Sequence, residues 1–212
     1  MEKLIYIYRH GETELNRAGI IQGSGVDAPL NTTGRLQARA FYETYKKVPF
    51  EAILTSTLQR THQTVEPFLQ KEIPWEKHPE INEMSWGEHE GKEGTPELRA
   101  SYRAMVEAWQ QGDFDARLGG GESAAEMAAR VRIFVDRLKV RTEQQLLVCA
   151  HGRLMRCLMC VLRGQPLQEM ENYHHSNTGL YKVEYRAGQF HFLRENDTTH
   201  LDALANLKLS TL

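Results

Sequence analysis

Strand-like runs alternate with helical patterns along this chain, and the alternation limits the possible fold more than any other feature. Runs rich in apolar and β-branched residues stand at 4–8, 52–55, 146–150, 180–185 and 190–194, with a weaker run at 78–82. Apolar residues recur at helical spacing at 32–45, 58–69 and 153–163. A further helix is expected after the glycines at 119–121, because Ser123 and Glu126 form a capping box. The pattern predicts an α/β protein.

The order of these elements also predicts the sheet. Strands that are joined through helices run parallel, so we expect a three-layer α/β/α sandwich with a mostly parallel central sheet. The last two strand-like runs are joined only by the turn "RAGQ", which favours an antiparallel hairpin at the edge. No linker-like segment divides residues 1–212, so we expect one domain. Ligands of such folds bind beyond the carboxyl ends of the strands.

Charge and hydropathy exclude several classes of protein. The chain has 26 Lys and Arg against 28 Asp and Glu, a net charge of −2, and therefore no general basic field for nucleic acid or anionic lipid. Its apolar runs are too short to span a bilayer, and its N-terminus lacks the features of a signal peptide. We therefore expect a cytoplasmic protein with no nucleic-acid or membrane partner, in which any anion site is local.

A C-x-x-C motif at Cys157 and Cys160 raises the possibility of a zinc or redox site. Both cysteines lie in the helical pattern at 153–163, where Leu154 and Leu158 mark the same apolar face. A zinc site would need a second pair of ligands, and no pair stands at a suitable spacing. Packing of both sulfurs as small apolar groups is therefore favoured.

Cationic side chains stand at three separate strand ends. Arg9 and His10 follow the run at 4–8, Arg60 lies early in the helix after 52–55, and His151 follows the run at 146–150. Each one alone is an ordinary turn or surface residue. Together on one rim they predict a phosphate pocket, because guanidinium groups and helix N-termini both suit tetrahedral oxyanions.

The same pocket has the groups for phosphoryl transfer. His10 is a nucleophile for phosphorus if one ring nitrogen is free and the other is held by a backbone carbonyl, and neighbouring arginines favour its neutral form. Glu83 is the candidate general acid, because a carboxyl group near Trp86 and a dianionic phosphate would keep its proton near neutral pH. Glu88 and Glu90 are the alternatives for this role.

The motifs "RHGETELN", "QG" at 22–23, "STLQRTHQT", "EMSWGEHEG", "GGGES" and "AHGRLMR" resemble, in order, those of the histidine phosphatase superfamily with its phosphoglycerate-mutase-like fold. The resemblance runs from residue 4 to about 185. It implies a phosphohistidine on His10 and Glu83 as the proton donor. It implies that phosphate is held by Arg9, Asn16, Arg60 and His151, with Gln22, Gly23 and Gly152 also at the phosphate or substrate. Residues 84–120 are implied to form a lid that decides the substrate.

Two features favour a phosphatase over a phosphoglycerate mutase. Mutases of the family usually carry Asn-Ser after the histidine and glycine of the last motif, whereas this chain has Arg153 and Leu154. Between 84 and 118 the chain has seven acidic residues against four basic ones, Lys92, Arg99, Arg103 and Arg117, which does not suggest a site for a doubly phosphorylated cofactor.

The expected activity is therefore hydrolysis of the phosphate monoester of a small cytosolic metabolite, with no metal ion or other cofactor. A phosphoglycerate mutase is the alternative enzyme. A silent module that binds phosphorylated ligands is the alternative outside the enzymes, although such a module would be expected to have lost His10 or Glu83. His89, His174 and His175 have no carboxylate spacing that indicates a metal site. The sequence leaves a homodimer open.

Overall fold

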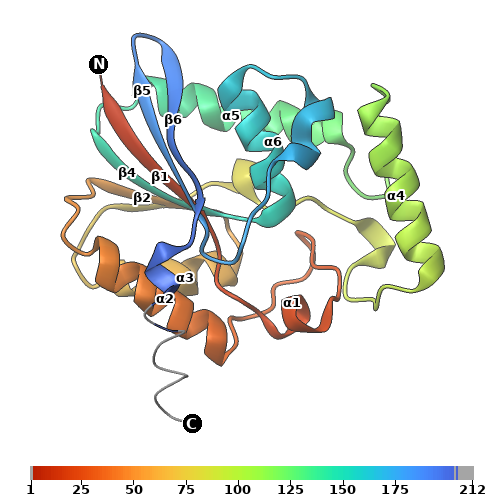
Figure 1. The fold of residues 1–212 in the computed structure, drawn as a ribbon, viewed down its shortest axis with the longest axis horizontal. Helices are drawn as coiled ribbons and strands as arrows, with labels where there is room; N and C mark the ends of the chain where they lie inside the picture. Colours follow the sequence, from red (N-terminus) through yellow and green to blue (C-terminus); the bar gives the residue numbers. More distant parts are fainter. Residues whose placement is uncertain (1, 203, 205–212) are drawn as a thin grey trace.

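A six-stranded sheet forms the centre of the computed structural model, which describes residues 2–202 and 204. Its strands lie in the order β3-β2-β4-β1-β5-β6 (Figure 1). The first four in this order pair in parallel, and β5 and β6 pair antiparallel at one edge. The strands are β1 Lys3–Arg9, β2 Ala52–Thr55, β3 Trp75–Lys77, β4 Gln145–Ala150, β5 Leu180–Arg186 and β6 Gln189–Asp197. The predicted mostly parallel sheet with an antiparallel edge is confirmed.

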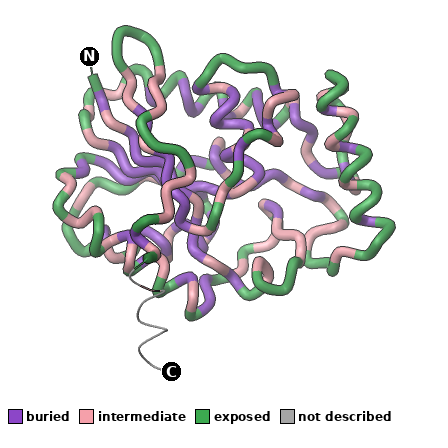
Figure 2. Tube along the Cα trace, in the orientation of Figure 1, coloured by how far each residue is buried: buried purple, intermediate pink, exposed green. Residues whose placement is uncertain are grey.

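Helices cover both faces of this sheet. On one side, α2 (Thr32–Tyr45) and α3 (Gln59–Leu69) pack on Tyr6 and Tyr8 of β1. On the other side, α5 (Ala124–Val140) and α6 (Gly152–Arg163) pack on Ile5 and Ile7. Successive residues of a strand point to opposite faces, so a strand that is covered on both sides must be apolar throughout. Figure 2 shows these central strands as buried.

The structure differs from the sequence prediction in three segments. Residues 78–82 are not a strand: β3 ends at Lys77, and a 3₁₀ helix, η1, occupies Pro79–Ile81. Pro79 explains the difference, because proline has no N–H to donate to a strand ladder. Two helices were not predicted, α1 (Glu14–Ala18) and α4 (Pro96–Gln110). The other short 3₁₀ helices are η2 Gly87–His89, η3 Leu167–Asn172 and η4 Thr199–Leu201.

Helix α4 occupies the middle of the segment 84–120, at the side of the molecule remote from the sheet (Figure 1). Thr95 caps the helix by accepting a hydrogen bond from the Leu98 N–H, and Pro96 stands in its first turn, where a missing N–H costs nothing. Its buried residues Met105 and Trp109 belong to the same core cluster as α5 and α6. The action of this segment as a lid stays a prediction.

The three cysteines are buried and free, and those of the C-x-x-C motif lie in the core face of α6. Burial raises the pKa of the Cys157 thiol to about 12, so the thiol stays protonated and apolar in character.

Within residues 2–202 and 204, no three His, Cys, Asp or Glu side chains gather as a metal-binding group. No helix in the same residues is long and apolar enough to cross a membrane.

The capping box at the start of α5 allows a test of the fold. The Ser123 hydroxyl accepts from the Glu126 N–H, and the Glu126 carboxylate accepts from the Ser123 N–H at 2.9 Å. We expect Ser123→Ala to lower the free energy of unfolding by about 1 kcal/mol, because it leaves a helix N–H without its partner. Urea unfolding measures this change. The exposed Ser101→Ala is the matched control, and an equal effect of both variants would contradict the role of the cap.

Candidate active site

A cavity of about 510 Å³ opens beyond the carboxyl end of β1. Arg9 and His10 reach it from the end of β1, Arg60 from the start of α3, and Gly152 from the first turn of α6. Residues of α4 and Trp86 also belong to its wall. Its remaining lining residues are Asn16, Gly19, Ile21, Gln22, Glu83, Gly94, Leu98, Arg99, Tyr102, Arg103, Arg153, Arg156 and His175.

Hydrogen bonds to the backbone at His10 and Gly11 hold the His10 side chain in place. Its Nδ1 lies 2.7 Å from the carbonyl oxygen of Gly11, which fixes the proton on Nδ1 and leaves Nε2 with its lone pair. The Gly11 N–H donates to the Thr64 hydroxyl at 3.0 Å, and the Asn177 amide donates to the His10 carbonyl at 3.0 Å. The ring is thereby fixed in the tautomer that a nucleophilic imidazole needs.

The surroundings also keep this imidazole uncharged. Burial lowers the pKa of His10 well below its usual range, and the positive charges of Arg60 and Arg9 lower it further. The hydrogen bond to Gly11 acts in the opposite direction, but it is the weakest of these effects. His10 is only 3% exposed, so water does not screen the arginines effectively.

Arg9 has N–H groups that are free to bind an anion. One of its terminal nitrogens donates to the His175 carbonyl at 3.0 Å, while its Nε is buried and has no hydrogen-bond partner among residues 2–202 and 204. A buried donor without a partner is costly, so its presence in a cavity points to a bound acceptor. The Gly152 position lies against the same guanidinium, where a Cβ would be 3.4 Å from it.

Arg60 and His151 form a buried pair behind the cavity wall. Arg60 Nε donates to His151 Nδ1 at 3.1 Å, and His151 Nε2 donates to the Ser56 hydroxyl at 2.8 Å. Both ring nitrogens of His151 are therefore engaged, and its side chain is not part of the lining, although its ring centre is 5.2 Å from that of His10. In this arrangement His151 orients Arg60, which does line the cavity.

Glu83 accepts three backbone hydrogen bonds. Its Oε1 accepts from the N–H groups of Met84 and Leu154, both at 2.9 Å, and its Oε2 accepts from that of Arg153 at 3.1 Å. Two of these donors belong to the first turn of α6, whose N-cap His151 makes no side-chain cap. Glu83 thus caps the N-terminus of α6 by accepting from its free N–H groups. The surroundings of its carboxyl group are therefore more polar than the proximity of Trp86 in the sequence had suggested.

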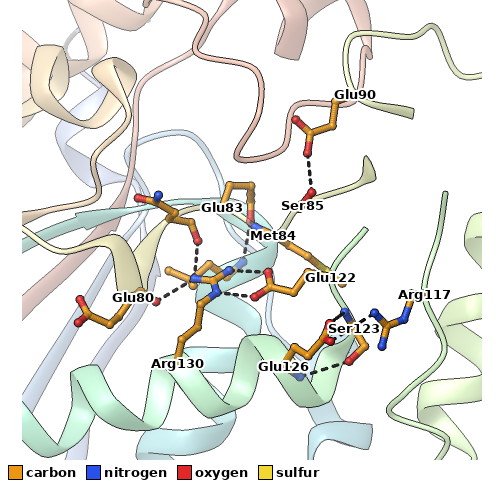
Figure 3. Close-up of polar contacts among 12 residues, drawn as sticks. Glu80, Glu83, Met84, Ser85, Glu90, Arg117, Glu122, Ser123, Glu126 and Arg130 are labelled. Carbon is orange, nitrogen blue, oxygen red and sulfur yellow. Dashed lines mark hydrogen bonds and ion pairs between the residues drawn. The ribbon is translucent and has the colours of Figure 1, made fainter. Parts of the chain in front are cut away.

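Arg130 of α5 fixes the loop that carries Glu83 (Figure 3). Arg130 holds Glu122 through two hydrogen bonds of 2.6 and 2.7 Å. It also donates to the carbonyls of Glu80 and Asn82, both at 2.8 Å. A planar guanidinium with four bonds has little freedom, so it defines where the backbone just before Glu83 lies.

The remaining predicted residues have different places. Asn16 and Gln22 line the cavity, and Gln22 Nε2 donates to the Thr13 hydroxyl at 2.7 Å. Gly23 does not line it; its carbonyl accepts from Arg60 at 3.2 Å, and a Cβ there would meet Glu90 at 2.0 Å. Glycine is therefore needed at position 23 for close packing rather than for contact with a ligand.

The residues that support His10 and His151 were missed by the sequence reasoning. Ser56, Thr64 and Asn177 act through single hydrogen bonds, and such polar residues are common throughout any sequence. Thr64 alone had a usable signal, since it lies one helical turn after Arg60 on α3. His175 also lines the cavity, and burial lowers its pKa to about 3.

One charge argument from the sequence is corrected by the structure. The excess of acidic residues between 84 and 118 did not suggest a site for a doubly phosphorylated cofactor, yet none of those acidic side chains lines the cavity. Arg99 and Arg103 from the same segment do line it, and so do Arg153 and Arg156 from α6. The charge of a whole segment is therefore a poor guide to the charge on one of its faces.

Comparison with known proteins places this geometry in a family. Residues 5–198 match the model of the histidine phosphatase superfamily, branch 1. An adenosylcobalamin/alpha-ribazole phosphatase of Salmonella typhimurium is 30% identical over 80% of this chain and 84% of its own. A 2,3-bisphosphoglycerate-dependent phosphoglycerate mutase of Methylobacterium radiotolerans is 35% identical over 77% and 81%. The solved alpha-ribazole phosphatase of Shigella flexneri has a TM-score of 0.80 at 25% identity, over 92% and 96%.

The chain therefore belongs to the histidine phosphatase superfamily. The family and the fold inferred from the ordered motifs are both confirmed, and so is the assignment of the chain to the phosphatase enzymes of this family.

Acid is expected to destabilise the protein, because the site holds His10 and His151 neutral. Burial and nearby cations lower the pKa of both below 6.5, the ordinary value. As the pH falls below about 6.5, the unfolded chain binds protons that the folded chain cannot, so the stability present at neutral pH is lost. The loss is at most about 1.4 kcal/mol per pH unit for each histidine.

Urea unfolding between about pH 7.5 and pH 5 measures this effect, because it spans the ordinary histidine pKa. The His10→Gln variant should lose stability less steeply than the native protein, since it has one such group fewer. Identical slopes for the two proteins would show that His10 does not resist protonation in the folded state.

Proposed function

We propose that this chain hydrolyses phosphate monoesters of a small cytosolic metabolite, without a metal ion, through a phosphohistidine on His10. The observation that carries the proposal is the state of His10: a buried neutral imidazole, with Nδ1 held by the Gly11 carbonyl, beside the guanidinium groups of Arg9 and Arg60. An imidazole in this tautomer presents the Nε2 lone pair, the electron pair that attack on phosphorus requires.

The first half of the reaction transfers the phosphoryl group. The Nε2 lone pair of His10 forms a bond to phosphorus while the bond from phosphorus to the ester oxygen breaks. Glu83 donates its proton to the leaving oxygen, so the alcohol leaves neutral. Arg9 and Arg60 offset the charge on the phosphoryl oxygens. These groups supply the charge compensation that metal ions supply elsewhere.

The second half returns the enzyme to its starting state. Water attacks the phosphohistidine, and the Glu83 carboxylate takes up a proton from that water. Breaking the bond between Nε2 and phosphorus releases inorganic phosphate and neutral His10. Glu83 is thus acid in one half and base in the other, which suits a carboxyl group held near both reaction partners.

The remaining features of the proposal concern the substrate. We propose that residues 1–212 act as one domain whose segment 84–120 is the lid, because residues of α4 from that segment line the cavity together with His10. The relatives that are named alpha-ribazole phosphatases act on phosphorylated small molecules, and they support a substrate of that size here. A cytoplasmic location fits such a substrate.

Phosphoglycerate mutase is the second candidate function, and two observations favour it. A relative with that name is 35% identical to this chain, and four arginines line the cavity in addition to Arg9 and Arg60. Against it, Arg153 replaces the Asn usual in mutases, and its guanidinium lies over the rings of Tyr102 and Trp109 instead of being free for substrate.

A covalent intermediate tests the proposal. Protein quenched within milliseconds of mixing with a phosphomonoester should carry a phosphate on His10 that is labile in acid and stable in base, because a phosphorus–nitrogen bond hydrolyses on protonation. Peptide mass spectrometry locates the label. The His10→Ala variant should show neither label nor turnover, and full activity in this variant would overturn the proposal.

Assays on the same purified protein distinguish the three candidate functions. Phosphate release without a bisphosphate primer supports the phosphatase. Primer-dependent interconversion of 2- and 3-phosphoglycerate that is much faster than phosphate release would identify a mutase. Tight binding of phosphate esters with neither reaction would identify a silent binding module.

Glu83 is tested through the leaving group. Glu83→Gln should slow hydrolysis of an alkyl phosphate by about 10²-fold or more, because an alkoxide needs a proton in order to leave. Hydrolysis of p-nitrophenyl phosphate should fall far less, since its phenolate is a good leaving group. The exposed Glu88→Gln is the control, with no change on either substrate. Equal losses on both substrates in Glu83→Gln would assign Glu83 to positioning α6 alone.

A further inference from the structure

The hydrogen bonds of Glu90 join two separate parts of the chain. Its Oε1 accepts from the Trp86 N–H at 2.8 Å and from the Ser85 hydroxyl at 3.2 Å, a contact that Figure 3 shows. Its Oε2 accepts from the Gly25 N–H at 2.7 Å. Glu90 does not line the cavity and has no part in the reaction proposed above. Its carboxylate therefore connects the start of the segment 84–120 to the loop around Gly25.

Glu90 fits closely against the backbone of this loop. A Cβ at position 25 would lie 2.7 Å from Glu90 Oε2, and one at position 23 would lie 2.0 Å from Oε1. Both distances are shorter than van der Waals contact, so only glycine leaves room for the carboxylate as it stands. The next residue, Gly91, donates its N–H to the Ile21 carbonyl at 2.9 Å. The two segments thus meet at backbone distance.

The same loop holds the guanidinium of Arg60. One terminal nitrogen of Arg60 donates to the Val26 carbonyl at 2.8 Å, and the other donates to the Gly23 carbonyl at 3.2 Å. Arg60 is buried, so an N–H group left without its acceptor would be costly. A planar guanidinium takes its orientation from its acceptors, so these two carbonyls decide how Arg60 faces the cavity.

Residues 23–26 depend on other segments for their position. They belong to no helix or strand, so no ladder of backbone hydrogen bonds fixes their carbonyls. At one end of the loop, Asp27 accepts from the Gln59 N–H at 2.7 Å, which ties the loop to the start of α3. At Gly25 the tie is Glu90. A change at Glu90 should therefore release the carbonyls that hold the guanidinium.

We propose that Glu90 is a positioning residue for Arg60. It fixes the loop 23–26, so that the carbonyls of that loop hold the guanidinium in the orientation that binds the phosphoryl group. The proposal rests on the proposed phosphatase function, in which Arg60 offsets the charge on the phosphoryl oxygens. It assigns to the phosphate site a residue that lies outside the cavity.

The charge of Glu90 alone predicts an effect of the opposite sign. Burial lowers the pKa of Arg60. The negative charge of Glu90 opposes this shift, as larger contributions from Glu83 and Asp27 do. Removal of a negative charge near the site would by itself strengthen the binding of an anion, whereas loss of a positioning contact would weaken it. The sign of the change therefore separates the two roles.

Glu90→Gln tests this sign. Glutamine has the size of glutamate but only one acceptor oxygen, so it cannot accept from both Gly25 and Trp86. We expect kcat/KM for p-nitrophenyl phosphate to fall by about tenfold, less than the roughly 10²- to 10³-fold cost of removing an oxyanion donor outright. The inhibition constant of inorganic phosphate should rise. Glu88→Gln, exposed in the same segment, is the control and should change neither value. Unchanged kinetics or a lower inhibition constant in Glu90→Gln would overturn the proposal.

A double variant tests whether the effect passes through Arg60. Arg60→Ala alone should lower kcat/KM by about 10²-fold or more, because it removes an oxyanion donor. Adding Glu90→Gln to Arg60→Ala should lower it further by less than about twofold, because no guanidinium is left to orient. A second loss of about tenfold would show that the two residues act independently, and the positioning role would be wrong.

Gly25→Ala disturbs the same contact without removing a charge, and it serves also if Glu90→Gln fails to fold. Gly25 does not have a positive φ, so alanine fits the backbone there, but its Cβ would displace the Glu90 carboxylate. This variant should show a loss of the same sign as Glu90→Gln and the same dependence on Arg60. Native activity in Gly25→Ala would contradict the proposal.

Binding separates a failure of this proposal from a failure of the proposed function. If no ester releases phosphate, the hydrolysis proposed above fails. Calorimetric binding of inorganic phosphate to the native protein, the two single variants Glu90→Gln and Arg60→Ala, and their combination then decides the role of Glu90. Weaker binding in Glu90→Gln, with no further loss when it is added to Arg60→Ala, supports the role. Equal affinities of the native protein and Glu90→Gln, or no binding of phosphate to the native protein, would overturn it.

Discussion

Burial of β1 on both faces is the constraint on which the rest of the molecule depends. Ile5 and Ile7 belong to the core beneath α5 and α6, and Tyr6 and Tyr8 belong to the core beneath α2 and α3. Pairing with β4 on one side and β5 on the other fixes the strand along its length. The backbone of His10 continues this ladder, because its N–H donates to the Ala150 carbonyl at 3.0 Å. The proposed nucleophile is thus positioned by a strand that is paired on both sides and buried on both faces.

Sequence patterns predicted the elements that local signals define, and they failed where distant contacts decide. The bounds predicted for α2 and β2 match the structure because periodicity and flanking residues mark them. Helix α4 is an exception, because Thr95 and Pro96 mark its start and its buried residues Leu98, Met105 and Trp109 recur at helical spacing. Its local signal was present in the sequence and was missed.

The same division applies to the candidate site. Arg9, His10 and Arg60 were predictable, since a parallel sheet brings its strand ends to one rim. The hydrogen-bond partners of each side chain could not be predicted. His151 was expected at the phosphate, yet it uses both ring nitrogens on Arg60 and Ser56. Roles of this kind depend on which donor meets which acceptor across the fold, and residue identity alone does not settle that.

Charge in this cavity is controlled by pairing more than by number. The end of the cavity at His10 combines an arginine whose Nε lacks a partner in the described residues with a histidine that burial keeps neutral, so an anion there would meet open donors. Elsewhere in the lining, Arg153 and Arg156 are already paired with Glu171. A guanidinium bound to a fixed carboxylate shapes the wall but offers little net attraction, whereas an unpaired one attracts an anion.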